Sequence, residues 1–340
     1  MAARAVEGGI RLKPSSSSQT VPDSVKPAFR RRLLAWYDAH ARDLPWRSNR
    51  DAYRVWLSEI MLQQTRVAAV MVHYCEFLHR FPTVEKLAAA REASVLASWS
   101  GLGYYRRARM LHAAAKVIVR DHGGKLPSTV ESLQTLPGIG RYTAAAIASI
   151  AFKEPVAVVD GNVERVLQRF SGQRLAPKEL WTRANQLLAV RRPGDFNQAM
   201  MELGATLCTP RNPACSTCPV TQLCATRGEL AANSKPVAQK KREIHYSLHF
   251  LNGNVLLVQR PRDASLMPSM WELPECSGAN PTIPPVLTLR HSITITDYTV
   301  RVWRLGAAGV GTGKWTPVER LKHTALTGLA RKILRAADII

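Results

Sequence analysis

The chain has 340 residues, of which 46% are hydrophobic, so its composition excludes a wholly disordered protein. It carries 47 lysine and arginine residues against 25 acidic residues, and the formal net charge of +22 points to a polyanionic partner, most simply nucleic acid, with an anionic membrane surface as the alternative. The chain contains no run of about 18 apolar residues, as a membrane-spanning helix needs, and its start has no apolar core of a secretion signal. We therefore expect an intracellular protein, cytoplasmic or nucleoid-bound in a bacterium and nuclear or mitochondrial in a eukaryote.

Residues 1–24 are rich in serine and poor in acids, and we expect them to form a flexible tail. Over residues 25–227 apolar side chains recur at helical spacing, and no alternating strand pattern occurs. Within this range Ser128 and Glu131 have the spacing of a capping box, which predicts a helix that begins after Ser128. The sequence predicts an all-α domain over residues 25–227.

Two glycines lie in the stretch Leu136–Gly140, which separates two helical segments. Gly138 and Gly140 would let the backbone turn tightly, and free N–H groups at the start of the next helix can hold a phosphate. This pattern is typical of a helix–hairpin–helix that grips the DNA backbone without reading its sequence. A plain helix–helix turn is the alternative.

Two carboxylates stand out in apolar surroundings. Asp160 follows the apolar run 156–159 and precedes a helix, so it is either an N-cap or an active-site group that stabilises a developing cation. Glu59 lies in segment 55–62, which is apolar nearly all round. Desolvation there would favour the protonated acid, as a general acid requires at neutral pH, whereas a glutamate on a solvated helix face is the alternative.

A second glycine-rich turn, Gly101–Arg107, combines aromatic and cationic side chains. Tyr104 is a candidate wedge between bases, with Arg106 and Arg107 neutralising phosphates, and a core tyrosine beside surface arginines is the alternative. Gln64 carries an amide that can hydrogen-bond a base edge.

Four of the six cysteines fall in one short segment with the spacing C-x6-C-x2-C-x5-C, namely Cys208, Cys215, Cys218 and Cys224. Zinc sites more often show two C-x2-C pairs, whereas irregular spacing of four thiolates is typical of a [4Fe–4S] cluster. Four cysteines without a metal are the remaining alternative. Cys75 and Cys276 stand in apolar contexts and are expected to be buried.

The composition changes after the last of these cysteines. Residues 228–243 are predicted to be a linker that ends in a basic run. Over residues 244–340 we expect a small α+β domain: Asn252-Gly253 predicts a hairpin, residues 293–302 alternate as in a strand, and Leu326 to Leu334 form a helical stripe.

Together these motifs resemble the adenine DNA glycosylases of the MutY type, which belong to the endonuclease III-like helix–hairpin–helix superfamily. The motifs are Leu44–Arg47, Ser58–Thr65, Gly101–Tyr105, Leu136–Gly140, Asp160–Val163 and the four clustered cysteines. The resemblance is strong over residues 25–227 and looser beyond them. It implies a helix–hairpin–helix glycosylase fold with a [4Fe–4S] loop at 208–224, followed by a Nudix-like domain.

The resemblance also implies a reaction: hydrolytic removal of adenine mispaired with 8-oxoguanine or guanine in double-stranded DNA, by a monomeric enzyme. It assigns Glu59 as the acid that protonates adenine N7 and later as the base for water, and Asp160 as the group that stabilises the oxocarbenium ion, with Asn162 beside it. Gln64 and Tyr104 fill or wedge the duplex while the base is flipped out. The positions that match the adenine pocket are Leu44, Trp46, Arg47, Val67 and Glu202.

The sequence departs from the superfamily pattern at three places. The lyases of the superfamily carry a catalytic lysine two residues after the last hairpin glycine, and this position is Tyr142 here, so no Schiff base is expected. The C-terminal part has no Nudix box, so nucleotide pyrophosphohydrolysis is not expected. The family's Phe-Ser-His loop is replaced around Thr294, which stands at the serine position and is the candidate contact to 8-oxoguanine. A purely structural strand is the alternative for this stretch.

Two other functions stay open from sequence alone. One is a bifunctional glycosylase and lyase for oxidised pyrimidines, against which Tyr142 argues. The other is a DNA-binding module without catalysis, which has no use for the buried carboxylates Glu59 and Asp160.

Overall fold

The computed structural model describes residues 20–230, 239–276, 284–293, 295–306 and 313–340. The chain forms two compact units. The first combines the chain up to Ala41 with Pro155–Leu230, and the second combines Arg42–Glu154 with the chain after Leu230. The helical region, which the sequence analysis treated as one domain, is thus divided between the two units. Within the described residues no helix is long and apolar enough to cross a membrane.

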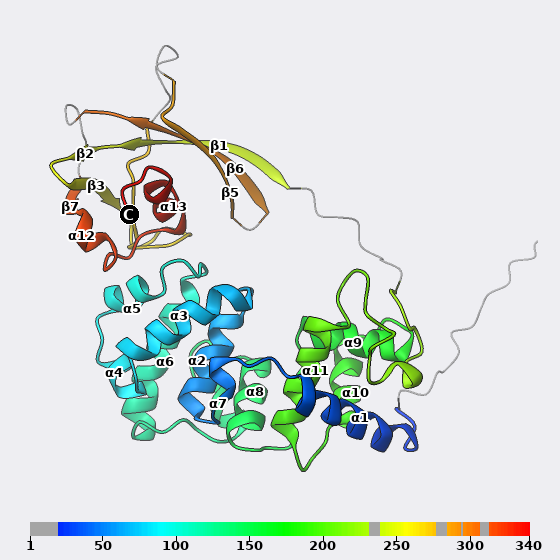
Figure 1. The fold of residues 1–340 in the computed structure, drawn as a ribbon. Coiled ribbons are helices and arrows are strands. Elements are labelled where there is room, and N and C mark those ends of the chain that lie inside the picture. The colour runs from blue at the N-terminus through cyan, green and yellow to red at the C-terminus, as the bar shows by residue number, and fades with distance from the viewer. Residues whose placement is uncertain (1–19, 231–238, 277–283, 294, 307–312) are drawn as a thin grey trace, which may run out of the picture. The chain divides into compact units, whose positions relative to one another are not determined.

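The first unit is entirely helical (Figure 1). Its elements are α1 (Val25–His40), α9 (Gly161–Ser171), α10 (Pro177–Leu187), α11 (Pro193–Thr206) and the short 3-10 helix η2 (Thr221–Leu223). Their apolar faces share one core, in which the Phe29 ring meets the Phe170 ring edge-on at 4.9 Å. Val21 belongs to this core and its N–H donates to Gln186 Oε1 at 2.9 Å. The expected flexible tail therefore does not reach residue 24, because Val21 already packs against the helices.

The second unit begins with a run of helices. They are η1 (Pro45–Arg47), α2 (Ala52–Leu62), α3 (Val67–Arg80), α4 (Val84–Ala88), α5 (Glu92–Ser98), α6 (Arg106–His122), α7 (Val130–Gln134) and α8 (Arg141–Ala151). The predicted capping box at Ser128 is wrong. The N-cap of α7 is Thr129, whose extended backbone places its side chain to accept from the N–H of Ser132. The all-α prediction itself is confirmed for this part and for the first unit.

The C-terminal part of the second unit contains strands and two helices. These are β1 (Lys240–Leu248), β2 (Phe250–Leu251), β3 (Asn254–Gln259), β4 (Trp271–Glu272), β5 (Leu287–Ile293), β6 (Thr296–Arg304), β7 (Lys314–Pro317), α12 (Val318–Leu321) and α13 (Gly328–Ala336). In one sheet β6 pairs with β1 in parallel and with β5 antiparallel. In the other sheet β3 pairs antiparallel with β2, β4 and β7. The apolar stripe of α13 shares a core with both sheets, which confirms the α+β prediction.

The hairpin between β2 and β3 forms as predicted. Asn252 and Gly253 have φ values of 48° and 70°, the two consecutive positive values that a tight hairpin turn requires. A second hairpin was not predicted: the alternating residues 293–302 belong to two strands, because Ile293 of β5 pairs with Thr296 of β6 across a two-residue turn. Thr294, the candidate contact to 8-oxoguanine, lies outside the described residues.

The boundary between the linker and the C-terminal part also differs from the prediction. The basic residues Lys240–Arg242, expected in the linker, form the start of β1 and pair with β6. A basic run is typical of a solvated linker, but these residues are also exposed at the end of a strand, where charge is equally tolerated. Composition alone does not separate the two cases.

Candidate active site

Helix α2 holds Glu59 in an apolar environment. The helix starts at an N-cap, Asp51, whose carboxylate accepts from the Arg54 N–H at 2.9 Å. Most residues of α2 are buried, and Glu59 is only 6% exposed, so the alternative of a solvated helix face is wrong. One carboxylate oxygen, Oε2, accepts a hydrogen bond of 2.7 Å from the Tyr142 hydroxyl. This contact fixes the orientation of the carboxyl group.

Tyr142 stands near the start of α8, directly after the glycine turn. Gly138 has a φ of +76°, and a Cβ there would lie 2.5 Å from Met110 Cβ, so only glycine fits. Gly140 has a φ of −88° and nothing within 4 Å of the place where a Cβ would lie, so of the two glycines only Gly138 requires glycine for the turn.

Asp160 is the N-cap of α9 in the first unit, so the interpretation of this residue as a helix N-cap is confirmed. Its Oδ1 accepts from the Val163 N–H at 2.7 Å, and its Oδ2 accepts from the Asn162 amide at 3.2 Å. Burial raises the pKa of Asp160, and the hydrogen bonds from Val163 and Asn162 act in the opposite direction. A carboxylate that is partly buried and held by donors on each oxygen is oriented and only partly hydrated, which suits the stabilisation of a nearby cation.

The extended segment before Asp160 is not part of a sheet. Its backbone forms hydrogen bonds with the side chains of two asparagines instead of with a neighbouring strand. Asn197 of α11 accepts from the Val158 N–H and donates to the Val156 carbonyl, while Asn185 of α10 accepts from the Ala157 N–H. Sequence reasoning missed both asparagines. A buried asparagine on a helix carries no pattern that distinguishes it from a surface one, so the sequence offered no signal for them.

The residues that match the family's adenine pocket are mostly buried in their own units. Leu44 and Trp46 are 4% and 8% exposed, and the Trp46 ring meets the Tyr74 ring edge-on at 5.5 Å. Arg47 donates to the carbonyl of Arg42, and the first residue of α3 is the partly buried Val67. These four positions belong to the second unit, and the fifth, Glu202, belongs to the first unit and is 1% exposed.

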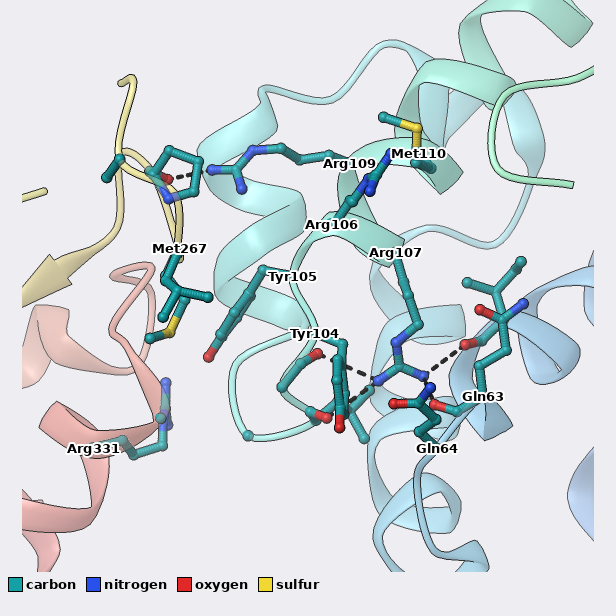
Figure 2. Close-up of a pocket in the computed structure, with 18 of the residues that line it drawn as sticks. Gln63, Gln64, Tyr104, Tyr105, Arg106, Arg107, Arg109, Met110, Met267 and Arg331 are labelled. Atoms are coloured by element: carbon teal, nitrogen blue, oxygen red, sulfur yellow. Dashed lines mark hydrogen bonds between the residues drawn. The ribbon is translucent and has the colours of Figure 1, made fainter. Parts of the chain in front are cut away.

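The glycine-rich turn before α6 presents an exposed aromatic ring. Tyr104 is 50% exposed, so the alternative of a core tyrosine is wrong, and its φ of +48° places the side chain in a strained left-handed backbone conformation. Gln64, also exposed and also left-handed at φ +55°, lies on the same cavity of about 1070 Å³. Figure 2 shows Tyr104 and Gln64 side by side at this cavity.

Arg107 does not have the role that the sequence predicted for it. It was expected to neutralise phosphates, but its guanidinium donates to six oxygens inside the protein, among them the carbonyls of Ile60 and Gly103. Arg106, the preceding residue, is exposed and lines the cavity, and its role as a cation for phosphate stays a prediction.

The four clustered cysteines line a single small cavity of about 30 Å³ in the first unit. The Arg169 guanidinium donates to Cys208 Sγ at 3.4 Å and to two carbonyls of the loop, which holds the loop in place. Burial raises the pKa of Cys218 to about 11, so binding of iron must displace a proton from this thiol. Within the described residues no group of three or more histidine, cysteine, aspartate or glutamate side chains is arranged to hold a single metal ion. An iron–sulfur cluster does not need such a group, because each of its thiolates binds a separate iron.

The two remaining cysteines are not buried as expected. Cys75 is exposed on α3, and Cys276 is partly exposed after β4. An apolar context in sequence does not place a residue on the buried face of a helix, and Cys75 lies on the outer face of α3.

Comparison with known proteins identifies the family. Residues 57–188 match the model of the HhH-GPD superfamily of base excision DNA repair proteins. A thermostable thymine-DNA glycosylase of known structure is 31% identical, with a TM-score of 0.57, and the match covers 97% of that chain and 60% of this one. The chain belongs to the HhH-GPD superfamily of base excision DNA repair proteins. Residues 208–224, which carry the four cysteines, match the iron-sulfur binding domain of endonuclease III, which confirms the prediction of an iron–sulfur cluster.

Among relatives in this superfamily, the adenine DNA glycosylases share much of the sequence. The chain is 51% identical over 225 residues to the enzyme of Mus musculus and 52% identical over 215 residues to that of Homo sapiens. These matches cover 60% and 59% of this chain. They cover 44% and 39% of the relatives, so the chain spans less than half of the length of either.

Proposed function

We propose that this chain is a monofunctional adenine DNA glycosylase, which hydrolyses the N-glycosidic bond of adenine mispaired with 8-oxoguanine or guanine in double-stranded DNA. The observation that carries the proposal is the 2.7 Å hydrogen bond from Tyr142 to Glu59. The position two residues after the hairpin glycine, where a lyase of this superfamily carries its lysine, serves here to orient a buried carboxyl group. The identity to adenine DNA glycosylases supports the choice of base.

In the proposed reaction Glu59 donates its carboxyl proton to adenine N7. The bond between C1′ and N9 then breaks, its electron pair stays on the protonated base, and adenine leaves as a neutral molecule. The sugar becomes an oxocarbenium ion, which the Asp160 carboxylate stabilises with Asn162 beside it. Glu59, now ionised, accepts a proton from water as the water oxygen attacks C1′, and this step restores the acid.

The DNA-binding residues act before the chemistry. The N–H groups after Gly138 and Gly140 hold a backbone phosphate, and the exposed Tyr104 ring enters the stack as the adenine is flipped out. Gln64, at the same cavity, hydrogen-bonds a base edge there. The five positions that match the family's adenine pocket are assigned to contact the adenine: Leu44, Trp46, Arg47, Val67 and Glu202.

We propose that the C-terminal part recognises the base opposite adenine. We propose that it is a Nudix-like domain that lacks nucleotide pyrophosphohydrolase activity. Thr294 stands at the family's serine position and contacts 8-oxoguanine through its hydroxyl. Because the aromatic and histidine neighbours of that serine are absent, a hydrogen bond worth about 1–3 kcal/mol carries most of the contact. Thr294→Ala should therefore reduce the preference for A opposite 8-oxoguanine over A opposite G.

The iron–sulfur cluster, when bound by Cys208, Cys215, Cys218 and Cys224, has a structural role in this proposal. Four thiolate bonds fix the loop and keep nearby cations such as Arg211 in position for the DNA backbone. The protein acts as a monomer on DNA.

The test is an excision assay on duplexes that carry A opposite 8-oxoguanine, G or T. We expect excision opposite 8-oxoguanine and G, with strand scission only after alkali or heat, and little or no adduct on borohydride treatment. Tyr142→Lys provides the matched control, because it restores an amine where the lyases carry one and should yield a trapped adduct. Scission without alkali or efficient trapping of the unaltered protein would favour the bifunctional alternative. Duplex binding without any excision would favour the non-catalytic module.

A further inference from the structure

Arg107 lies at the start of α6 and connects two segments that are far apart in the sequence. One terminal nitrogen donates to the last carbonyls of α2 and the turn after it, those of Ile60, Met61 and Gln63, at 2.5–2.9 Å. The other terminal nitrogen donates to Thr65 Oγ1 and to the carbonyls of Leu102 and Gly103, at 2.9–3.3 Å. Figure 2 shows the Arg107 guanidinium beside the Tyr104 ring, with dashed lines to some of these acceptors.

The charge of Arg107 is compensated by the backbone. The acceptors from α2 are the carbonyl oxygens at its C-terminal end, which have no partner within the helix and carry the negative end of the helix dipole. Burial lowers the pKa of Arg107 to about 10, which leaves the side chain protonated at neutral pH. A charged group that has so many internal acceptors has little capacity left for a phosphate.

The same guanidinium also contacts the exposed ring. Its central carbon lies 5.4 Å from the centroid of the Tyr104 ring and 5.5 Å from that of the buried Trp99. Such distances are typical of cation–π contacts. Tyr104 has an unfavourable left-handed backbone and half of its surface in solvent, so its position must be held by neighbours. Arg107 contacts both its ring and the carbonyl of the residue before it.

We propose that Arg107 is a positioning residue: it holds the Tyr104 ring ready to enter the DNA stack and ties that ring to the end of the helix that carries Glu59. The inference rests on the proposed function, because it presupposes a base that is flipped and excised. It also explains why an arginine is needed, since a lysine ammonium has three donors and cannot span acceptors on both segments.

The test is a double-mutant cycle between Arg107→Met and Tyr104→Ala, measured as single-turnover excision of A opposite 8-oxoguanine. If Arg107 acts through Tyr104, Arg107→Met should lower the rate about tenfold or more in the unaltered protein and much less in the Tyr104→Ala background. The spectroscopic readout is 2-aminopurine placed beside the mispaired adenine, because unstacking of this base on binding raises its fluorescence. Arg107→Met and Arg107→Lys should both reduce that rise.

Arg80→Met is the matched control. Arg80 also lies over an aromatic ring, that of Phe81 at 5.6 Å, and donates to Ser98, but it is remote from Tyr104 in the sequence and does not line the cavity. Its excision rate and fluorescence should stay within about twofold of the unaltered protein. Far-UV circular dichroism and iron content identify any variant that has not folded. If Arg107→Met does not fold, Arg107→Lys, which keeps the charge and most of the volume, replaces it in the double-mutant cycle.

The outcomes separate the two proposals. Equal rate losses from Arg107→Met with and without Tyr104 would overturn the inference, since they would show that Arg107 acts through the fold or α2 alone. An Arg107→Met rate equal to that of the unaltered protein would overturn it as well. If the unaltered protein excises no adenine, the proposed function fails, and the fluorescence cycle still tests whether Arg107 positions Tyr104 on DNA.

Discussion

The Tyr142 hydroxyl donates to Glu59 Oε2 at 2.7 Å, across 83 positions of the sequence. The contact exists because α2 packs against α8, so the residue after the glycine hairpin and a buried glutamate meet. In this way one position both removes the amine of a lyase and orients the proposed acid.

We predict that Glu59→Gln abolishes excision, because an amide cannot donate a proton to adenine N7. Loss of general acid catalysis is worth about 100- to 10,000-fold in rate. Binding to the mispaired duplex should stay nearly unchanged, as measured by gel shift. A single-turnover rate within tenfold of the unaltered protein would show that Glu59 is not the acid.

Tyr142→Phe should have a smaller effect than Glu59→Gln. A lost hydrogen bond to a charged group corresponds to about 1.5–3 kcal/mol, hence a rate loss of roughly 10- to 100-fold if the bond orients Glu59 during the reaction. The double variant Glu59→Gln with Tyr142→Phe should be no slower than Glu59→Gln alone. Further slowing would mean that Tyr142 acts independently of Glu59.

Asp160→Asn should abolish excision without loss of stability at neutral pH. Asparagine keeps the N-cap of α9, and it removes the cost of ionising a partly buried carboxyl group. Asp51→Asn, at the exposed N-cap of α2, is the matched control and should retain activity. Substantial excision by Asp160→Asn would refute a role for the carboxylate in stabilising the sugar cation.

The pH dependence of stability follows from the same residue. Because burial raises the pKa of folded Asp160, the unfolded chain loses this proton first as the pH rises, and the free energy of unfolding falls through that interval. The contribution is fully present below the unfolded pKa and is lost above the folded one. Urea denaturation at pH 4 and pH 7 should therefore show Asp160→Asn gaining stability relative to the unaltered protein as the pH rises. No change in that difference would contradict the raised pKa.

The two hairpin glycines should respond differently to alanine. Gly138→Ala forces a positive φ and a clash with Met110, so we expect a loss of about 1–3 kcal/mol in the free energy of unfolding. Gly140→Ala meets no neighbouring atom and should change stability by less than about 0.5 kcal/mol. Gly140→Ala should nevertheless weaken duplex binding, because its methyl group obstructs the approach of a phosphate to α8. Equal stability losses for the two variants would contradict the difference in backbone geometry.

The purified protein should be brown, with about four irons per chain. Cys218→Ser should lose the colour and the affinity for DNA together, because the loop that presents Arg211 is no longer fixed. Cys75→Ser is the control, since this cysteine is exposed on α3 and should leave the colour and binding unchanged. One zinc per chain without iron would refute the cluster.

Residue type and spacing were sufficient to predict the helical region, the glycine hairpin, the cysteine loop and the first β-hairpin. They failed where one local pattern fits two structures. The alternation of residues 293–302 suits one strand or two, and only the pairing of Ile293 with Thr296 decides between them. An arginine beside a tyrosine suits a phosphate site or an internal support, and the six acceptors around Arg107 decide for the latter.

The sequence by itself determined which groups are available for chemistry: a glutamate in an apolar segment, an aspartate at a helix start, four cysteines in one loop and no lysine after the hairpin. The tertiary structure decided which of these groups are held, and by what. Tyr142 meets Glu59, and Asn197 and Asn185 support the segment before Asp160, through contacts between residues far apart in the chain. Local preference and periodicity report only the nearest few residues, whereas a side-chain hydrogen bond depends on how whole helices pack.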